Sequence, residues 1–385
     1  MKLSFRLAYR NLMGAGLRTW LNVGVLSFAF VVIIFYRGLI DGWNQQARRD
    51  SIAWEYGHGH LLHAGYDPAD PFSVQDGHGI LPRNQQQHLS PILLRQATVY
   101  PQGRMVPVVL KGIDVNQNTL ALPVRMLSGS TADIPAMVGT RMAKSLQLKQ
   151  GDELLLRWRD KNGTFDAANI NIATIFDTDV SAVDNGQIWI PIEKLWTMTG
   201  LQGHATYFVA SAGYQPHEIA GWKFKSQKEM LQSLDNIIQS KNIGGSIMYL
   251  LLLAIALLAI FDTQVLSIFR RQREIGTYIS LGMTRWQVVG LFTTEGTMYS
   301  FLATIVGCIY GIPLFIFMAN TGIAMPEATQ DMGVSVAGTI YPVYGAGLII
   351  STIVLVVISS TIVSFLPARK IARMDPVNAL KGKLQ

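Results

Sequence analysis

Four long apolar runs alternate with polar sequence along the chain and predict four transmembrane helices. The runs cover residues 19–40, 243–269, 286–319 and 343–366. About 20 apolar residues, each rising 1.5 Å along a helix, cross the hydrocarbon core of a bilayer. The first run starts too late and is too long to be a cleavable signal peptide. The expected fold is therefore a membrane protein with four transmembrane α-helices.

Between the first two runs, residues 41–242 have the composition of a water-exposed domain. Short alternating runs at residues 104–115, 154–176, 186–195 and 206–211 predict strands. Asn162-Gly163 predicts a hairpin turn within the second of these runs. Residues 139–154 predict a short helix that turns into a strand at Gly151-Asp152, and residues 216–241 a helical stalk entering the second span. We expect a large α+β domain with two lobes, inserted between helices 1 and 2.

The placement of basic residues predicts the orientation in the membrane. The chain is 49% hydrophobic and 15% charged, with a net charge of +7. Its basic residues crowd the ends of the apolar runs, which is a topology signal and argues against nucleic-acid binding. No Lys or Arg occurs in residues 286–368, so residues 320–342 are expected to form an outer loop. The basic segments 1–18, 270–285 and 367–385 are expected inside, which places the large domain outside.

Residues 1–18 carry four basic side chains and no acid. They predict a cytoplasmic amphipathic helix on the inner membrane surface, with a plain basic flank as the alternative.

Catalytic and metal-binding motifs are absent from the sequence. It contains no GxxxxGK[ST] phosphate loop, no GxSxG elbow and no HExxH helix. His58, His60 and His63 leave a metal site open, but turn histidines are favoured because no acid or Cys stands at ligand spacing. Cys308 is the sole cysteine, so no intramolecular disulfide can form. We expect no metal and no cofactor in this chain.

Two acids, Asp262 and Glu295, fall within apolar runs, and buried membrane acids are functional candidates by default. Both are expected near Arg270 and Arg271, so structural pairing is favoured over proton coupling. Small residues at four-residue spacing in the third run predict close helix packing: Ala303, Gly307 and Gly311.

The segment after the second run, residues 270–285, is basic and amphipathic. Its sequence RRQREIGTYISLGMTR places Ile275, Ile279 and Leu281 on one helical face, between arginines. A membrane span that ends in such a bend can be displaced by a force applied at the membrane surface.

This bend carries a family resemblance. RRQREIGTYISLGMTRWQVVGLFTTEG resembles the signature of FtsX-like permeases, and LPARKIARMDPVNALKG resembles their carboxy-terminal ending. Near the start, LAYRNL, GLIDGW and GHGHLLHAGYDP resemble the lipoprotein-releasing (LolC/LolE-type) branch, as does GTRMAKSLQLKQGDELLL in the outer domain. Together these segments extend over nearly all of the chain.

The resemblance implies a type VII ABC transporter permease in the bacterial inner membrane, with its large MacB-like domain in the periplasm. Two permeases, identical or paralogous, would bind a cytoplasmic dimer of ATPase subunits that hold ATP and Mg. The permease itself would be non-catalytic. It would release lipoprotein or lipidic cargo by mechanotransmission, with a possible periplasmic carrier or membrane-fusion protein as a further partner.

The resemblance also implies residue roles. The bend would be a coupling helix seated on the ATPase through Arg271, Arg273, Glu274, Ile275, Gly276, Leu281 and Gly282. Acyl chains of the cargo would lie between spans 1 and 2, against Leu39, Ile40, Trp43, Met248, Tyr249 and Leu252.

Three other functions remain open at this point. A MacB-like exporter would push periplasmic cargo into an outer-membrane duct, and the absence of a fused ATPase favours the lipoprotein-releasing type over it. An FtsX-like regulator of cell-wall hydrolases is disfavoured by the size of the outer domain. An intramembrane enzyme would need a nucleophile and a base, and no such pair is identified.

Overall fold

The computed structural model describes residues 16–129, 132–325 and 338–373, and the chain divides into two compact units. Unit 1 consists of Met1–Gly42, Gln239–Ile323 and Tyr341–Gln385, and unit 2 of Trp43–Ile238 and Ala324–Ile340. The predicted amino-terminal amphipathic helix, most of the outer loop and most of the basic tail lie outside the described residues.

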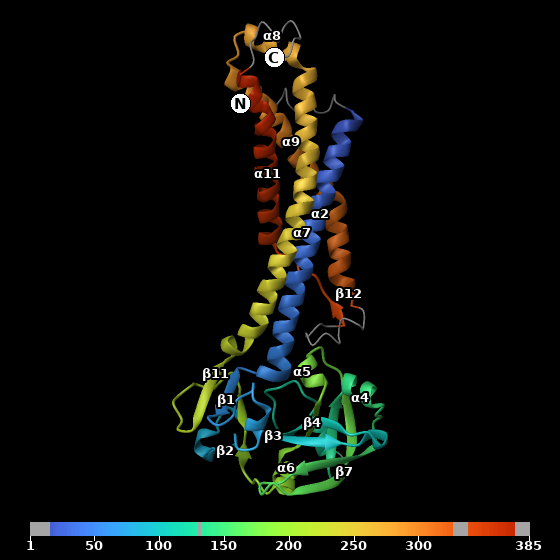
Figure 1. Ribbon diagram of the computed structural model, residues 1–385, viewed down its shortest axis with the longest axis vertical. Coiled ribbons are helices and arrows are strands. Elements are labelled where there is room, and N and C mark those ends of the chain that lie inside the picture. The colour runs from blue at the N-terminus through green and yellow to red at the C-terminus, as the bar shows by residue number, and fades with distance from the viewer. Residues whose placement is uncertain (1–15, 130–131, 326–337, 374–385) are drawn as a thin grey trace. The chain divides into compact units, whose positions relative to one another are not determined.

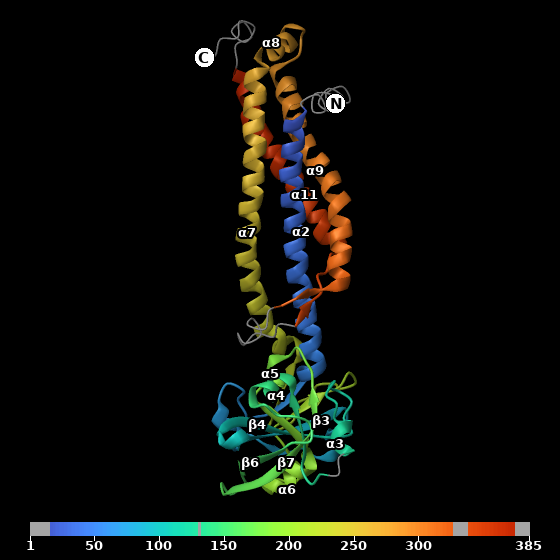
Figure 2. The ribbon, with the colours of Figure 1, turned by 90° about the vertical axis from the view of Figure 1, so that its right-hand side faces the viewer.

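Helices make up unit 1 (Figures 1 and 2). Their bounds are α2 Leu17–Ser51, α7 Gln227–Arg270, α8 Gln272–Ser280, α9 Arg285–Thr321 and α11 Ala346–Ala368, followed by a 3-10 turn at Arg369–Arg373. Within the described residues, α2, α7, α9 and α11 are long and apolar enough to cross a membrane, by length and composition.

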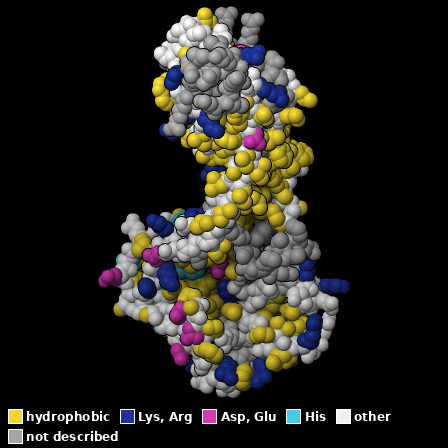
Figure 3. Space-filling model, turned by 45° about the horizontal axis from the view of Figure 1, so that its top comes forward, with side chains coloured by type: hydrophobic (Ala, Val, Ile, Leu, Met, Phe, Trp, Pro, Cys, Tyr) yellow, Lys and Arg dark blue, Asp and Glu magenta, His cyan; other side chains and the backbone are white. Residues whose placement is uncertain are grey.

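Burial differs among these four helices. Half of the most apolar stretch of α2 is buried, against 22% for each of the other three. Figure 2 shows α2 between its neighbours, and Figure 3 shows hydrophobic side chains gathered over the visible face of the helices. Apolar side chains that stay exposed on a bundle fit contact with lipid, in which no hydrophobic penalty applies.

Small residues of α9 allow the close helix packing that the sequence predicts. A Cβ atom added at Gly307 would lie 2.9 Å from Phe30 Cδ1, and one at Gly311 would lie 3.0 Å from Val31 Cγ2, both on α2. Ala303, one turn earlier, is buried. The prediction for this stripe is confirmed, and its role is packing.

Two helices extend beyond the predicted spans. The predicted first span ends at residue 40, whereas α2 continues to Ser51 and carries the chain into unit 2. The predicted stalk over 216–241 is helical only from Gln227, because Trp222–Ser226 pairs as a strand instead. From Gln227 the helix runs without a break to Arg270, as expected.

Unit 2 contains a nine-stranded mixed sheet in the order β11-β1-β10-β3-β4-β8-β5-β7-β6. Its strands are β1 Gly59–His63, β3 Leu89–Val99, β4 Val106–Ile113, β5 Pro135–Gly139, β6 Glu153–Arg159, β7 Phe165–Phe176, β8 Gln187–Pro191, β10 Tyr207–Ala210 and β11 Trp222–Ser226. The short strands are β2 Gly79–Ile80, β9 His204–Ala205, β12 Ile323–Ala324 and β13 Thr339–Ile340. The helices are α3 Arg125–Ser128, α4 Thr140–Leu146, α5 Ser181–Asp184 and α6 Ile192–Thr199, with a π-helix at Ile52–Tyr56 and 3-10 turns at Pro71–Val74, Arg83–Gln85 and Pro101–Gly103.

The sheet closes on itself, because β3 pairs with β4 on one side and with the far strand β6 on the other. Taken in the order of the sheet, β3-β4-β8-β5-β7-β6 therefore form a six-stranded barrel. Its inward side chains make one apolar core that includes Val99, Leu110, Leu156 and Ile188. Closure removes the free edges of these strands. The two lobes stay a prediction: one sheet runs through the unit, because the 11-residue β3 serves both the barrel and the β10-β1-β11 extension, while the buried side chains form separate clusters.

The predicted hairpin over residues 154–176 is confirmed as β6 and β7. Its turn differs from the two-residue Asn-Gly type. The Asp160 carboxylate accepts hydrogen bonds from the backbone N–H groups of Asn162 (2.9 Å) and Thr164 (2.8 Å), and of these loop residues only Gly163 has a positive φ. Residues 160–164 thus form a longer loop organised by an aspartate.

Candidate functional site

The basic bend forms a helix, α8, in the turn between α7 and α9 (Figure 1). Gly282 has φ 99°, a conformation that favours glycine, and it reverses the chain after α8. Thr284 then starts α9 with a capping box: its hydroxyl accepts from Gln287 N, and the Gln287 side chain accepts from Thr284 N. Local sequence therefore fixes both ends of the bend.

The apolar face of α8 is occupied by the rest of unit 1. Ile275 is fully buried in a cluster with Ile268, Val288, Phe292 and Ile371, which come from α7, α9 and the turn after α11. Periodicity predicts this apolar face, and the family resemblance implies that it docks on the ATPase, but in the structure it holds α8 against its own chain. Gly276 is buried too, so neither it nor Ile275 is available to a partner without rearrangement.

A different set of residues faces outward from the bend. Of the predicted coupling residues, Arg273, Glu274, Leu281 and Gly282 are exposed, and Leu281 is 78% exposed. Trp286, which is not among the predicted coupling residues, is 62% exposed at the start of α9. Its hydrophobicity places it in the third apolar run, but its position beside Thr284 and Arg285 marks the edge of that run.

An ion pair ties α8 to α9. The Arg271 guanidinium donates to both carboxylate oxygens of Glu295, at 3.1 and 2.9 Å, and also to Glu274 at 2.7 Å. It lies 4.8 Å from the centre of the Phe292 ring. Glu295 is buried, and Gly296 beside it packs directly against the Ser364 side chain of α11. A displacement of α8 would therefore be passed to α9 through a short polar contact.

The second membrane acid lies elsewhere. Asp262 is exposed on α7, in a row of exposed apolar side chains that includes Ile255, Leu258 and Leu266. An exposed carboxylate in such a row is costly in lipid, so this face of α7 is suited to a protein partner.

The residues predicted to contact cargo differ in burial, and two of them line one cavity. Ile40 and Tyr249 line the same cavity of about 160 Å³ in unit 1, together with Arg37 and Asp41. Leu39 and Leu252 are half-buried and Met248 is exposed, whereas Trp43 is only 4% exposed. The cavity is polar, because Arg37, Asp41 and Ser246 line it beside the two tyrosines.

Of the three histidines near residue 60, His58 lies in a turn and is exposed, as predicted, whereas His60 and His63 belong to strand β1. His60 stacks on Tyr207 with ring centres 4.6 Å apart, and its Nε2–H donates to the backbone oxygen of Glu55 at 3.0 Å. His63 accepts from Gly65 N and packs edge-on against Trp222. Among the described residues, no three His, Cys, Asp or Glu side chains gather as metal ligands.

Burial makes the stability of unit 2 sensitive to acid. It lowers the pKa of His60 to about 4, against about 6.5 in an unfolded chain. The folded state then binds fewer protons, so its stabilisation is complete above pH 6.5 and falls as the pH drops toward 4. We expect the free energy of unfolding to fall by about 2 kcal/mol from this residue between pH 7 and pH 5.

Thermal unfolding of the whole protein at both pH values measures this effect. His60→Gln keeps a donor for the Glu55 oxygen and should reduce the pH dependence by the share of this residue, leaving that of His78, whereas the exposed control His217→Gln should retain all of it. An unchanged slope in His60→Gln would rule out this histidine as the cause.

Comparison with known proteins bears on the helical unit in particular. Residues 246–376 match the family model described as FtsX-like permease C-terminal. The chain is 32% identical over 126 residues to a pyoverdine export ATP-binding/permease protein, PvdT, of Pseudomonas syringae pv. tomato, covering 33% of this chain and 17% of that protein. It is 27% identical over 209 residues to a macrolide export ATP-binding/permease protein, MacB 2, of Aeromonas hydrophila, covering 50% of this chain and 30% of that protein.

A solved structure was also found, the extracellular domain of the noncanonic ABC-type transporter YknZ from Gram-positive bacteria. It covers 40% of this chain and 83% of the solved chain, with 12% identity and a TM-score of 0.25. The matches to PvdT and MacB 2 span less than a third of the length of those relatives.

Proposed function

Because this chain is an ABC transporter permease of the FtsX/MacB type, we propose that it turns ATP hydrolysis by an ATPase bound at α8 into movement of unit 2. One observation carries the proposal: α8 is fixed to the ends of α7, α9 and α11 through the Ile275 cluster and the Arg271–Glu295 pair. A push on its exposed face therefore moves these helices as a body. The 44-residue α7 continues into unit 2 and would transmit the motion over about 66 Å.

The proposed assembly needs partners. A dimer of ATPase subunits would hold ATP and Mg on the cytoplasmic side, and this chain would act without catalysing the hydrolysis. A second permease, identical or paralogous, would cover the row on α7 that contains Asp262. The complex would lie in the bacterial inner membrane, with unit 2 on the periplasmic side, where a carrier or membrane-fusion protein could receive cargo.

The cargo proposed first is a lipoprotein or another lipidic molecule, taken from the outer leaflet beside α2 and α7. The resemblance of the chain's start to the lipoprotein-releasing branch supports this choice. The polar character of the cavity at Ile40 and Tyr249 argues for contact with a headgroup there, not with acyl chains. A MacB-like exporter is the second candidate, because the relatives with matching segments are named for the export of macrolides and pyoverdine.

The sidedness of the two units is the most direct test. In a Cys308→Ala background, we expect Asn162→Cys in the β6–β7 loop to react with a membrane-impermeant maleimide in cells with a permeabilised outer membrane. We expect Ser280→Cys at the end of α8 to react only after the inner membrane is opened. Labelling of both positions from the same side would contradict the proposed transmission across the membrane.

A further inference from the structure

A cavity of about 590 Å³ opens in unit 2 where strand β3 changes partners. Strand β10 pairs with β3 only as far as Ile92, and β6 begins to pair with it at Ala97. The two neighbouring strands diverge between these points, and the turn at Pro71–Val74 covers the gap only in part. Force transmission along α7 does not require this cavity, so the side chains that line it need a separate explanation.

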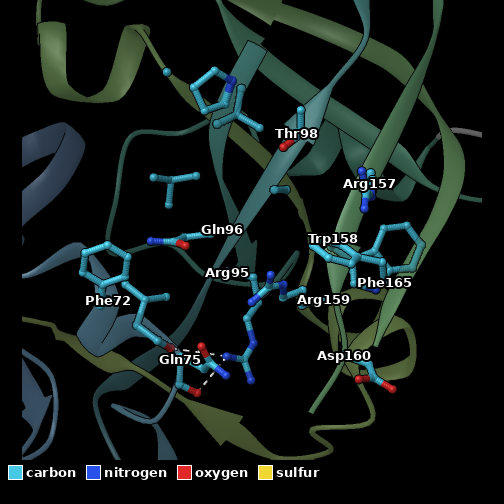
Figure 4. A pocket seen from close by; sticks show the side chains of 16 residues that line it. Phe72, Gln75, Arg95, Gln96, Thr98, Arg157, Trp158, Arg159, Asp160 and Phe165 are labelled. Atoms are coloured by element: carbon cyan, nitrogen blue, oxygen red, sulfur yellow. Dashed lines mark hydrogen bonds between the residues drawn. The ribbon is translucent and has the colours of Figure 1, made fainter. Parts of the chain in front are cut away.

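Three arginines line this cavity (Figure 4). Arg95, on β3, is only 5% exposed. Its Nη1 donates to the backbone oxygens of Val74 (3.3 Å) and Gln75 (3.0 Å), and its Nη2 faces His78 Nε2 at 3.0 Å. Its Nε has no hydrogen-bond partner among the residues that the structure describes. A buried guanidinium is thus held in place by neutral acceptors, with one donor left unused.

The other two arginines are held by an aromatic ring. The guanidinium carbons of Arg157 and Arg159 lie 3.9 and 4.4 Å from the centre of the Phe165 ring. Cation–π contact of this kind orders side chains that would otherwise move freely in water. Phe72 adds further aromatic surface to the cavity wall (Figure 4), whereas Trp158, between the two arginines on β6, is buried in the barrel core.

No salt bridge neutralises this group within the part of the chain that the structure describes, although the nearby carboxylate of Asp76 favours the charged form of Arg95. No Asp or Glu oxygen there forms a salt bridge, within 4.0 Å, with any of the three guanidiniums. Asp160 also lines the cavity, with its Oδ1 held by two N–H groups of the β6–β7 loop, so the three arginines keep an excess of positive charge over Asp76 and Asp160.

His78 adds no charge of its own. Because its Nε2 accepts from Arg95, its proton lies on Nδ1 and is donated to Nδ1 of His204 at 2.9 Å. Burial and the nearby Arg95 lower the pKa of His78 to about 4, so the ring is neutral near pH 7.

We propose that this cavity is a binding site for a small oxyanion, a carboxylate or a phosphate ester, attached to a flat apolar body. Guanidinium groups bind both headgroups through paired N–H donors. Arg95 supplies buried positive charge at depth, while Arg157 and Arg159 supply charge at the rim. The aromatic wall accommodates the apolar body, and the volume is that of a pocket for a small organic molecule.

Fluorine NMR on the full chain in detergent tests the site with three probes: 4-fluorobenzoate, 4-fluorophenyl phosphate and the neutral 4-fluorobenzyl alcohol. We expect line broadening for at least one of the two anions and none for the alcohol, and the anion that binds tighter identifies the headgroup. The double variant Arg157→Gln/Arg159→Gln should weaken that binding about tenfold or more. Arg104→Gln removes an exposed arginine outside the cavity and should change nothing.

A second variant keeps the test informative if the double variant folds poorly. Phe165→Leu retains every charge and should weaken binding by releasing Arg157 and Arg159 from the ring. The proposal is overturned if neither anion binds at millimolar concentration, if the alcohol binds equally well, or if folded variants bind like the native protein. Failure of this site would leave the proposed coupling at α8 untouched, because the two experiments share no residue.

Discussion

Glu295→Gln should destabilise unit 1 by about 3 kcal/mol, because it leaves Arg271 without its principal counter-charge in a buried place. The Glu295 side chain is 7% exposed and that of Arg271 is 17% exposed, so water screens the pair weakly. Glu274, the other partner of Arg271, is 54% exposed and offers only weak compensation. Thermal unfolding in detergent should show the loss, and transport should fall while the ATPase continues to hydrolyse ATP.

Two further variants separate the pair from its surroundings. Glu274→Gln removes the exposed partner and should cost less than about 1 kcal/mol. The double replacement Arg271→Met/Glu295→Met should cost less than the sum of the single replacements, since it removes both charges together. Glu295→Gln that unfolds like the native protein, yet abolishes transport at every pH, would contradict this structural role and would indicate proton coupling instead.

The spans and the bend could be read from the sequence because both are local patterns. A run of about 20 apolar residues is long enough to cross a bilayer wherever it stands in a fold. Helix ends were harder to place. Residues 41–51 are polar and would have signalled the start of the soluble domain, yet α2 continues through them, since nothing there prevents a helix from extending into water.

Periodicity also shows that a helix has an apolar face without showing what covers it. The sequence places Ile275 and Ile279 on one face of α8, and the structure places them in the cluster of their own chain, at Val288 and Phe292. Only the packed structure leaves Leu281 and Trp286 as the exposed apolar pair.

Long-range pairing could not be predicted at all. The barrel closes because β3 meets β6, with Ala97 opposite Trp158, and no local alternation of side chains specifies that register. The same closure brings Arg95 into one cavity with Arg157 and Arg159, more than 60 residues away in the chain. The candidate oxyanion site is therefore a product of tertiary structure.

Leu281→Asp combined with Trp286→Asp should abolish stable binding of the ATPase. The native side chains Leu281 and Trp286 are 78% and 62% exposed at the bend, and exposed Arg273 and Arg285 lie near them in sequence. Large exposed apolar groups of this kind contribute most of the binding energy of protein interfaces. A tryptophan at an interface centre alone contributes about 2 kcal/mol or more, so recovery of the ATPase in mild detergent should drop at least tenfold. The unfolding temperature should hardly change, because the two side chains lie outside the core.

Two controls decide whether the loss belongs to the interface. Ile275→Ala should do the opposite: it should lower the stability of unit 1 by about 2–5 kcal/mol, since it opens a cavity beneath α8, and any loss of ATPase should follow that instability. Met105→Asp, at a 69% exposed position in unit 2, should alter neither property. If the Leu281/Trp286 variant recovered the ATPase at the native level, the outward face of the bend would not be where the motor binds, and the fixed attachment of α8 to three helices would need another purpose.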